Sequence, residues 1–347
     1  MRIAPPPWLM AQELGYRLPE KAIERNFMAY KFEPDESVRE AVLRTADEQL
    51  RRAEHELTEG IRADPVTAVH SARKALKKER ALLRLSRDAL GPGSRRRENA
   101  ALRNAARQLS DTRDAEVLVQ ALDSISERYA GQLSEVTFGA FREELEAERD
   151  LAREKLNDPT LASAVVDQLE ASRLRIADWR LKRGGWKAVD GGLLRSYRRG
   201  RKAFAEARAV PDGEHLHQWR KRAKDLWYGL RLLAPVCGEA VRGQAKEAHA
   251  LSDLLGDDHD LAVLRQTLVR SGHDVPADLD ALLALIDHRR KQLQQQALAV
   301  GEIVYAEKPK AFRRRVHRSW RAGRSREHAR SPDPVELADA TRVAAVA

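Results

Sequence analysis

A row of cationic side chains, spaced for one side of a helix, stands out in residues 69–91. Its members are His70, Arg73, Lys77, Arg80 and Arg84. Steps of three and four residues place side chains above one another on an α-helix, where like charges repel and destabilise the isolated helix. A solvated face in a chain rich in Asp and Glu usually mixes the two signs. We therefore interpret this unmixed row as an anion-binding face rather than a merely solvated one.

A second copy of the pattern occupies residues 217–238. Alignment of HSARKALKKERALLRLSRDALG with HQWRKRAKDLWYGLRLLAPVCG pairs His70 with His217, Arg73 with Arg220, Lys74 with Lys221, Lys77 with Lys224 and Arg84 with Arg231. Further along, LSDTRDAEVL at 109–118 matches LGDDHDLAVL at 255–264. A repeat of this length indicates two similar structural units, each carrying one cationic helix.

The residue types in both rows favour phosphate as the ligand. Arg presents a planar fork of donors that matches phosphate oxygens, Lys supplies a compact charge, and a protonated His donates from both ring nitrogens. Side chains at these spacings repeat about every 5 Å along a helix axis, which suits an extended polyanion better than a compact ligand. A bound polyanion would also raise the pKa of His70 and His217 and favour their protonated forms.

Further basic side chains extend the candidate site beyond the two rows. The stretch GGLLRSYRRGRKAF places four cations on one side of a third helix and its apolar residues on another. The predicted binding set therefore also includes Lys78, Arg113, Arg195, Arg198, Arg199, Lys202, Lys308, Lys310, Arg313 and Arg314. Glu48 of the first unit stands where the second has Arg195, so the two units are not expected to bind equally.

The DDHD sequence that starts at Asp257 allows three interpretations. Asp257, His259 and Asp260 could hold a divalent metal, as imidazole and carboxylate ligands do in all-α phosphohydrolases. The matched pair of the first unit is Arg113-Asp114, however, and arginine does not bind metals. A helix cap at Asp257, with Asp260 three residues on, fits both units. In the third interpretation, Asp114 and Asp260 orient the side chains beside them. We predict no metal and no cofactor.

Composition and hydrophobic spacing define the fold class. Leu and Ala dominate the apolar residues, aromatics make up 5% of the chain, and apolar positions follow a 3.6-residue period. We predict an all-α protein whose internal repeat forms two similar four-helix bundles. Lys and Arg total 63 against 53 Asp and Glu, and the resulting net charge of +10 favours anionic partners.

Cysteine usage and hydropathy bear on compartment and anchoring. Cys237 is the single cysteine, which rules out a disulfide framework and fits a reducing compartment. The first residues lack the apolar run of a signal peptide, and no stretch approaches the ~20 apolar residues that span a bilayer. We expect a cytoplasmic protein without a membrane partner.

Turn and capping signals divide the chain into segments. Asp64 and Pro65 mark one helix start, and the glycine-rich KRGGWKAVDGG stretch separates the two units. The predicted segments are a leader at 1–34, a first four-helix bundle at 35–157, a connecting helix and glycine-rich joint at 158–188, a second four-helix bundle at 189–306, a basic terminal helix at 307–324 and a disordered tail at 325–347.

Each cationic helix also carries a predicted buried stripe. The two stripes are Ala72, Leu76, Leu83 and Leu90, and Ala223, Leu226, Leu230 and Leu233. Trp219, Trp227 and Tyr228 lie beside the second cationic row. They could stack on nucleic-acid bases, but their helical spacing favours a place in the core.

Five separated motifs together resemble the CHAD family, the conserved histidine α-helical domain. They are HSARKALKKERALLRL, HQWRKRAKDLWYGLRLL, LSDTRDAEVL, LGDDHDLAVL and GGLLRSYRRGRKAF, across residues 33–324. The resemblance implies two four-helix bundles related by an internal pseudo-twofold repeat, with basic helices lining a shared groove or pore. It also implies non-enzymatic binding of inorganic polyphosphate and association with polyphosphate granules. It makes His70 and His217 the signature histidines. The Glu-x-Glu-x-Lys motif of the CYTH domain found in many relatives is absent, so we expect a stand-alone form.

Two other functions remain as alternatives. The charge permits nucleic acid or another polyanion as partner, although nothing in the sequence points to the reading of bases. The less favoured alternative is a metal-dependent phosphohydrolase that uses Asp257, His259 and Asp260.

Overall fold

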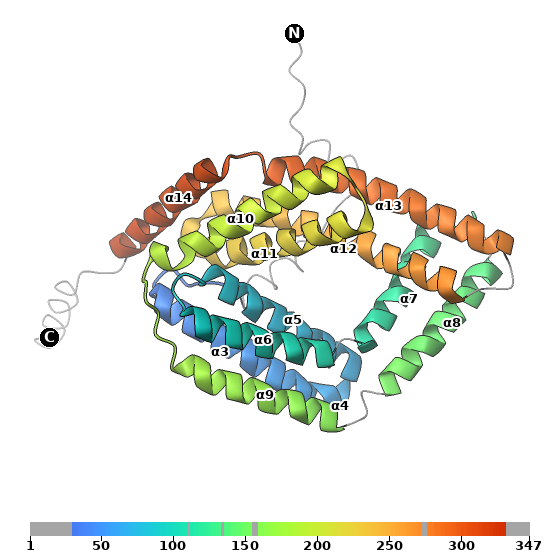
Figure 1. Ribbon diagram of the computed structural model, residues 1–347, viewed down its shortest axis with the longest axis horizontal. Helices are drawn as coiled ribbons and strands as arrows, with labels where there is room; N and C mark the ends of the chain where they lie inside the picture. Colours follow the sequence, from blue (N-terminus) through green and yellow to red (C-terminus); the bar gives the residue numbers. More distant parts are fainter. Residues whose placement is uncertain (1–29, 110, 133–134, 155–158, 272–275, 331–347) are drawn as a thin grey trace, which may run out of the picture.

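The computed structural model describes residues 30–109, 111–132, 135–154, 159–271 and 276–330, and every regular element within these ranges is a helix (Figure 1). The predicted all-α class is confirmed. Over the same ranges, none of the helices has a segment long and apolar enough to cross a bilayer.

Local capping explains where the first helices begin. The Ser37 side chain accepts from the backbone N–H of Glu40, while the Glu40 carboxylate accepts from the Ser37 N–H. The Asp64 carboxylate accepts from two N–H groups of the next first turn, so the predicted cap is confirmed. That helix ends at Leu85. The elements are α3 (Val38–His55), a π-helical turn (Glu56–Gly60), α4 (Ile61–Ala63), α5 (Pro65–Leu85) and α6 (Pro92–Gln108).

Three helices complete the first half of the chain: α7 (Asp111–Arg128), α8 (Glu135–Glu154) and α9 (Pro159–Ala177). The α7–α8 hairpin lies at one end of the molecule, where α7 packs on α12 (Glu239–Ser271) of the second half (Figure 1). Helix α9, which falls within the predicted connecting segment, packs along α3 and α6. The first half therefore closes its core with α9 and extends α7 and α8 toward the second half.

The second half forms longer helices: α10 (Trp186–Ala209), α11 (Gly213–Cys237), α12, α13 (Pro276–Val304) and α14 (Pro309–Arg330). Helix α12 runs without a break through Asp257 and Asp260, so the predicted cap at Asp257 is wrong. In the first half, α6 ends at Gln108, just before the matched stretch, and α7 begins within it at Asp111. The side chains of residues 111–114 lie outside the described part, so the structure does not show what Asp114 contacts.

Helices α5 and α11 lie side by side at the centre of the molecule and contact each other (Figure 1). Both predicted stripes are buried in the core that these helices share with their neighbours. Trp219, Trp227 and Tyr228 are at most 6% exposed, which confirms that they belong to the core. Because the stripes face inward, the cationic rows of α5 and α11 are left on other sides of the two helices.

A short segment ahead of α3 joins the two halves. The Tyr30 hydroxyl donates to the carbonyl of Lys78 in α5, and the backbone N–H of Phe32 donates to the carbonyl of Leu232 in α11. Both aromatic side chains are fully buried. Tyr30 and Phe32, which the prediction placed in the leader, therefore belong to the core.

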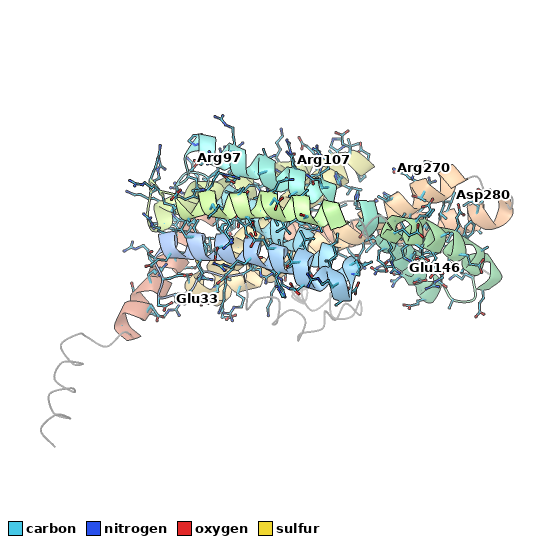
Figure 2. The ribbon with its side chains drawn as sticks, turned by 90° about the horizontal axis from the view of Figure 1, so that it is seen from below. Glu33, Arg97, Arg107, Glu146, Arg270 and Asp280 are labelled. Atoms are coloured by element: carbon cyan, nitrogen blue, oxygen red, sulfur yellow. The ribbon has the colours of Figure 1, made fainter. Side chains whose placement is uncertain are left out.

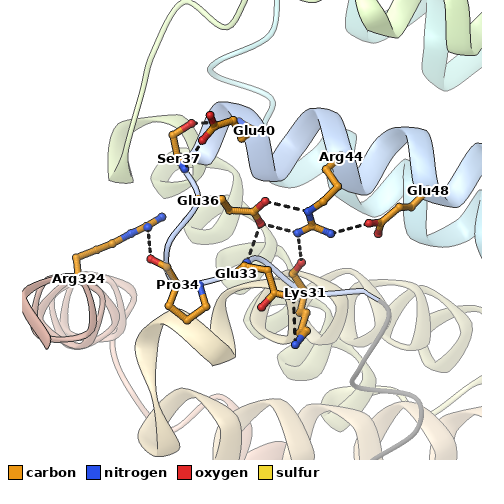
Figure 3. Close-up of polar contacts among 9 residues, drawn as sticks. All are labelled: Lys31, Glu33, Pro34, Glu36, Ser37, Glu40, Arg44, Glu48 and Arg324. Atoms are coloured by element: carbon orange, nitrogen blue, oxygen red, sulfur yellow. Dashed lines mark hydrogen bonds and ion pairs between the residues drawn. The ribbon is translucent and has the colours of Figure 1, made fainter. Parts of the chain in front are cut away.

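Polar contacts hold this segment from both sides (Figure 3). Arg44 of α3 pairs with the Glu36 carboxylate and donates to the carbonyl of Lys31. Arg324 of α14 donates to the carbonyl of Pro34. The first helix and the last helix of the described chain are thus tied to the same short stretch.

Replacement of Phe32 tests whether this segment stabilises the fold. We expect Phe32→Ala to lower the free energy of unfolding by about 3–5 kcal/mol, because the change leaves a cavity between the halves. Denaturant unfolding followed by circular dichroism measures the loss. Leu174→Ala, at a side chain that is 72% exposed, is the control and should cost less than about 0.5 kcal/mol. Equal effects of the two changes would show that the segment adds no stability.

A buried carboxyl lies in the first half. Glu79 of α5 is fully buried, and its oxygens have no hydrogen-bond partner among the described residues. Burial, reinforced by the charge of Glu98, raises the pKa of Glu79 to about 8. Glu98 differs because Arg175 donates to both of its oxygens. Glu79 therefore carries a proton in the folded state at neutral pH.

This carboxyl should make the folded state less stable as the pH rises. The folded pKa of Glu79 lies above the unfolded value, so the stabilisation is complete below the unfolded pKa and is lost as pH rises through about 8. We expect Glu79→Gln to remove this contribution. The midpoint of thermal unfolding should then fall less between about pH 5 and pH 8.5 in the variant than in the wild type. Identical pH profiles would contradict the assignment.

Candidate anion-binding face

An ion pair joins α5 to α11 between the two cationic rows. The Nε of Arg84 lies 2.8 Å from Oδ1 of Asp225, and Nη1 of Arg222 lies 3.2 Å from Oδ2. The Asp225 side chain is only 9% exposed, so water screens these pairs weakly. Asp225 and Arg222 were not predicted from the sequence, because they lie on the same helix as His217 but outside its aligned row.

Further guanidinium groups surround this carboxylate. Partial burial and then neighbouring arginines lower the pKa of Arg80 and of Arg199, against the opposing effect of Asp225. These side chains come from four helices, α5, α6, α10 and α11. We call the set the basic face; its members are Arg80, Arg84, Arg103, Arg195, Arg199 and Arg222. The predicted rows of α5 and α10 thus contribute to one site.

More arginines continue the basic face toward the start of α6. Burial and then three arginine charges lower the pKa of Arg95. The three neighbours are Arg87, Arg96 and Arg195. Figure 2 shows α6, with Arg107 labelled, along an outer edge of the molecule. The run SRRRE at 94–98 signals these α6 arginines in the sequence, but it has no counterpart in the second copy of the repeat and was therefore overlooked.

Two predicted binding residues lie in the core and not on the basic face. Lys78 is 2% exposed and Arg231 is 1% exposed. Both cations lie against the ring of Tyr30, at 5.5 and 5.7 Å from its centroid. Burial, reinforced by the charge of Arg231, lowers the pKa of Lys78 to about 7. Since the segment before α3 covers this side of the helices, the expected contact of Lys78 and Arg231 with a polyanion is corrected.

The signature histidine of the second half lies in a separate cluster between α11 and α12. The rings of His217 and His259 stack with their centroids 4.5 Å apart. Burial and then the charge of Arg220 lower the pKa of His259 to about 4, and burial and then Lys221 lower the pKa of His217. Both imidazoles are thus neutral at pH 7 in this structure. The protonated His217 expected for binding would form only when a bound polyanion raises the pKa of the imidazole.

Asp260 lies beside the same cluster. Its Oδ1 is 3.8 Å from Nη2 of Arg220, and the Arg220 guanidinium passes next to Gly256 on α12. This contact agrees with the interpretation that Asp260 orients a neighbouring cation. Lys221 is exposed and Lys224 is half-buried, so both sides of the cluster carry positive charge.

The first-half counterparts lie where α5 approaches the α7–α8 hairpin. Arg73 donates to the carbonyl of Leu109, which ties α5 to the end of α6. Lys74 is half-buried and Lys77 is exposed. His70 is half-buried and lines a cavity with Asp64, Thr67, Glu116, Gln120 and Arg153. His70 is therefore separated along α5 from the basic face, whose α5 members are Arg80 and Arg84.

The remaining predicted residues are spread over α10 and α14. The exposed ones are Arg198, Lys202, Lys308, Lys310, Arg313 and Arg314. Lys202 pairs with Glu206 at 3.5 Å. Arg313 binds both carboxylate oxygens of Asp190, so this side chain links α14 to α10. The side chain of Arg113 lies outside the described part of the chain.

The metal-binding alternative finds no converging ligands. Within the described ranges, no group of three or more His, Cys, Asp or Glu side chains could hold a metal ion. His259 faces His217 and the cations Arg220 and Lys224, and this charge opposes a divalent cation.

Comparison with known proteins identifies the family. The model of the CHAD domain matches residues 44–269, so the chain belongs to the CHAD family. Two uncharacterized proteins of Mycobacterium tuberculosis, MT2285 (strain CDC 1551 / Oshkosh) and Rv2226 (strain ATCC 25618 / H37Rv), are 29% identical over 228 and 232 residues. These matches cover 60% of this chain and 41% of each relative, so the chain spans about two fifths of their length.

Two solved structures are similar in fold. PptA from Streptomyces chartreusis has a TM-score of 0.55 at 15% identity, and the match covers 78% of this chain and 100% of that chain. The CHAD domain from the plant Ricinus communis has a TM-score of 0.49 at 21% identity, over 84% of this chain and 95% of that chain. The likeness to PptA shows the fold alone.

The histidine cluster yields a prediction for titration. We expect the His259 imidazole to titrate near pH 4 in the free protein, because burial and the neighbouring cations disfavour its charged form. Arg220→Gln should raise this pKa, since among the neighbouring cations Arg220 lowers the pKa of His259 the most. Imidazole NMR signals followed against pH measure both values, and His259→Gln assigns the signal. Titration of the wild-type signal between about pH 6 and 7 would contradict the cluster.

Proposed function

We propose that this chain binds inorganic polyphosphate without catalysing a reaction. The observation that carries the proposal is the basic face, in which six arginines from four helices lie close to one another and two of them pair with Asp225. This excess of positive charge can be neutralised by a polyanion. CHAD domains are often linked to polyphosphate binding, which agrees with the charge of this face.

The choice of arginine favours phosphate oxygens as the groups bound. A guanidinium stays charged when partly buried and donates two parallel hydrogen bonds to one phosphate. Partial burial and the charges of neighbouring arginines lower the pKa of Arg80 and Arg199, so keeping these guanidinium groups charged carries a cost. A bound phosphate chain would offset that cost. Because the donors come from several helices, the ligand they suit is extended and carries several charges.

Recognition of bases is less well supported than recognition of phosphate. The aromatic side chains nearest the second cationic row, Trp219, Trp227 and Tyr228, are buried in the core. They therefore offer no surface on which bases could stack. A chain that binds long polyphosphate would also be found where that polymer accumulates, so we extend the proposal to polyphosphate granules.

The central test removes three arginines of the basic face. We expect Arg84→Gln/Arg103→Gln/Arg199→Gln to weaken binding of long-chain polyphosphate at least about tenfold, because each lost charged contact contributes on the order of 1.5–3 kcal/mol. Titration calorimetry at fixed salt measures the affinity. By analogy with nucleic acids, the loss of contacts should also reduce the slope of log affinity against log salt concentration.

A matched variant separates the site from net charge. Arg142→Gln/Arg208→Gln/Arg265→Gln removes the same number of charges from paired arginines on α8, α12 and the end of α10. It should weaken binding much less. Equal weakening by the two triple variants would contradict a localised site, and phosphate release from polyphosphate in the presence of Mg²⁺ would contradict a non-enzymatic role.

A further inference from the structure

A single carboxylate occupies the centre of the basic face. Asp225 uses its two oxygens separately, with Oδ1 on Arg84 of α5 and Oδ2 on Arg222 of α11. A phosphate group would use the same arrangement, because its oxygens can each pair with a neighbouring guanidinium group. With 9% of its side chain exposed, Asp225 sits within the face rather than at its rim. Asp225 therefore occupies guanidinium groups of Arg84 and Arg222 that an incoming anion would bind.

The acid is particular to the second half of the chain. In the alignment that pairs His70 with His217, the residue matched to Asp225 is Lys78. An acid at this position is thus no general requirement of the repeated helix. Its presence beside Arg84 and Arg222 calls for a role at this one place.

We propose that Asp225 is a built-in counter-anion that a phosphate group of the polymer must displace from Arg84 and Arg222. This inference rests on the proposed polyphosphate binding and names the residue that sets its affinity and selectivity. Displacement breaks two ion pairs in a weakly screened place. A single phosphate has no other contacts to offset that loss. A polymer has them, because its further phosphates bind neighbouring arginines at high effective concentration.

The same carboxylate stabilises the protein in the absence of ligand. It lies among arginines of α5, α10 and α11 whose charges repel one another. Its removal should therefore have two opposite effects. The folded protein becomes less stable, and the arginines become available to anions without competition.

The test compares Asp225→Asn with the wild type for two ligands. We expect the variant to bind long-chain polyphosphate about tenfold more tightly, since a competing charged contact is gone. We also expect orthophosphate to raise the thermal unfolding midpoint of the variant and not that of the wild type. Without ligand, the midpoint of the variant should be lower. Asp123→Asn, which removes an equal charge from a pair with Arg142 on the α7–α8 hairpin, is the control and should change the affinity less than about twofold.

The outcomes are distinguishable. Polyphosphate affinity that is unchanged or weaker in Asp225→Asn overturns the inference and leaves the proposed function standing, because Asp225 would then only orient its arginines. Absence of binding by the wild type overturns both. Asp225→Ser, also neutral and smaller, gives the same decision if the asparagine variant does not fold. An equal gain in Asp123→Asn assigns the effect to net charge and overturns the inference as well.

Discussion

Arginines from four helices meet where α5 contacts α11, and the carboxylate of Asp225 lies among them. Guanidinium groups this close repel one another, and partial burial removes much of the water that would screen them. The paired stripes of α5 and α11 supply the apolar burial that brings the charges together, and Asp225 relieves part of their repulsion. The surface that remains carries an excess of positive charge, so it is stabilised further by any anion that it binds.

The cations on the two sides of the α5–α11 pair have different kinds of partner. On one side, Arg84 meets Asp225 in an ion pair. At the matched positions on the other side, Arg231 and Lys78 both lie against the ring of Tyr30 and are almost fully buried. The twofold relation between the halves stays a prediction. The matched positions thus lie on the basic face in one case and in the core in the other.

Capping residues and hydrophobic spacing predict only some of the helix boundaries in the two halves. The cap at Asp64 and the buried stripes were predicted correctly because capping and 3.6-residue spacing are local properties. The cap at Asp257 was predicted wrongly because an acid pair three residues apart also suits the surface of a continuous helix. Helix α12 passes through it, and α7 of the first half packs against α12. The continuous helix thus goes with the packing of α7 on α12, which the capping pattern does not reveal.

The sequence by itself determined the helical class, the repeated cationic helices and the identity of the inward stripes, because each depends on residues a few positions apart. Only the tertiary structure decided which cations gather on the basic face. Lys78 and Arg231 do not belong to the basic face, because they are buried against the ring of Tyr30, which lies far from both in the chain. Asp225 and the α6 arginines do belong to the basic face, because contacts between helices bring them there. The periodicity of one helix assigns a side chain to a side of that helix, but it carries no information on which other helix covers that side or what charge it brings.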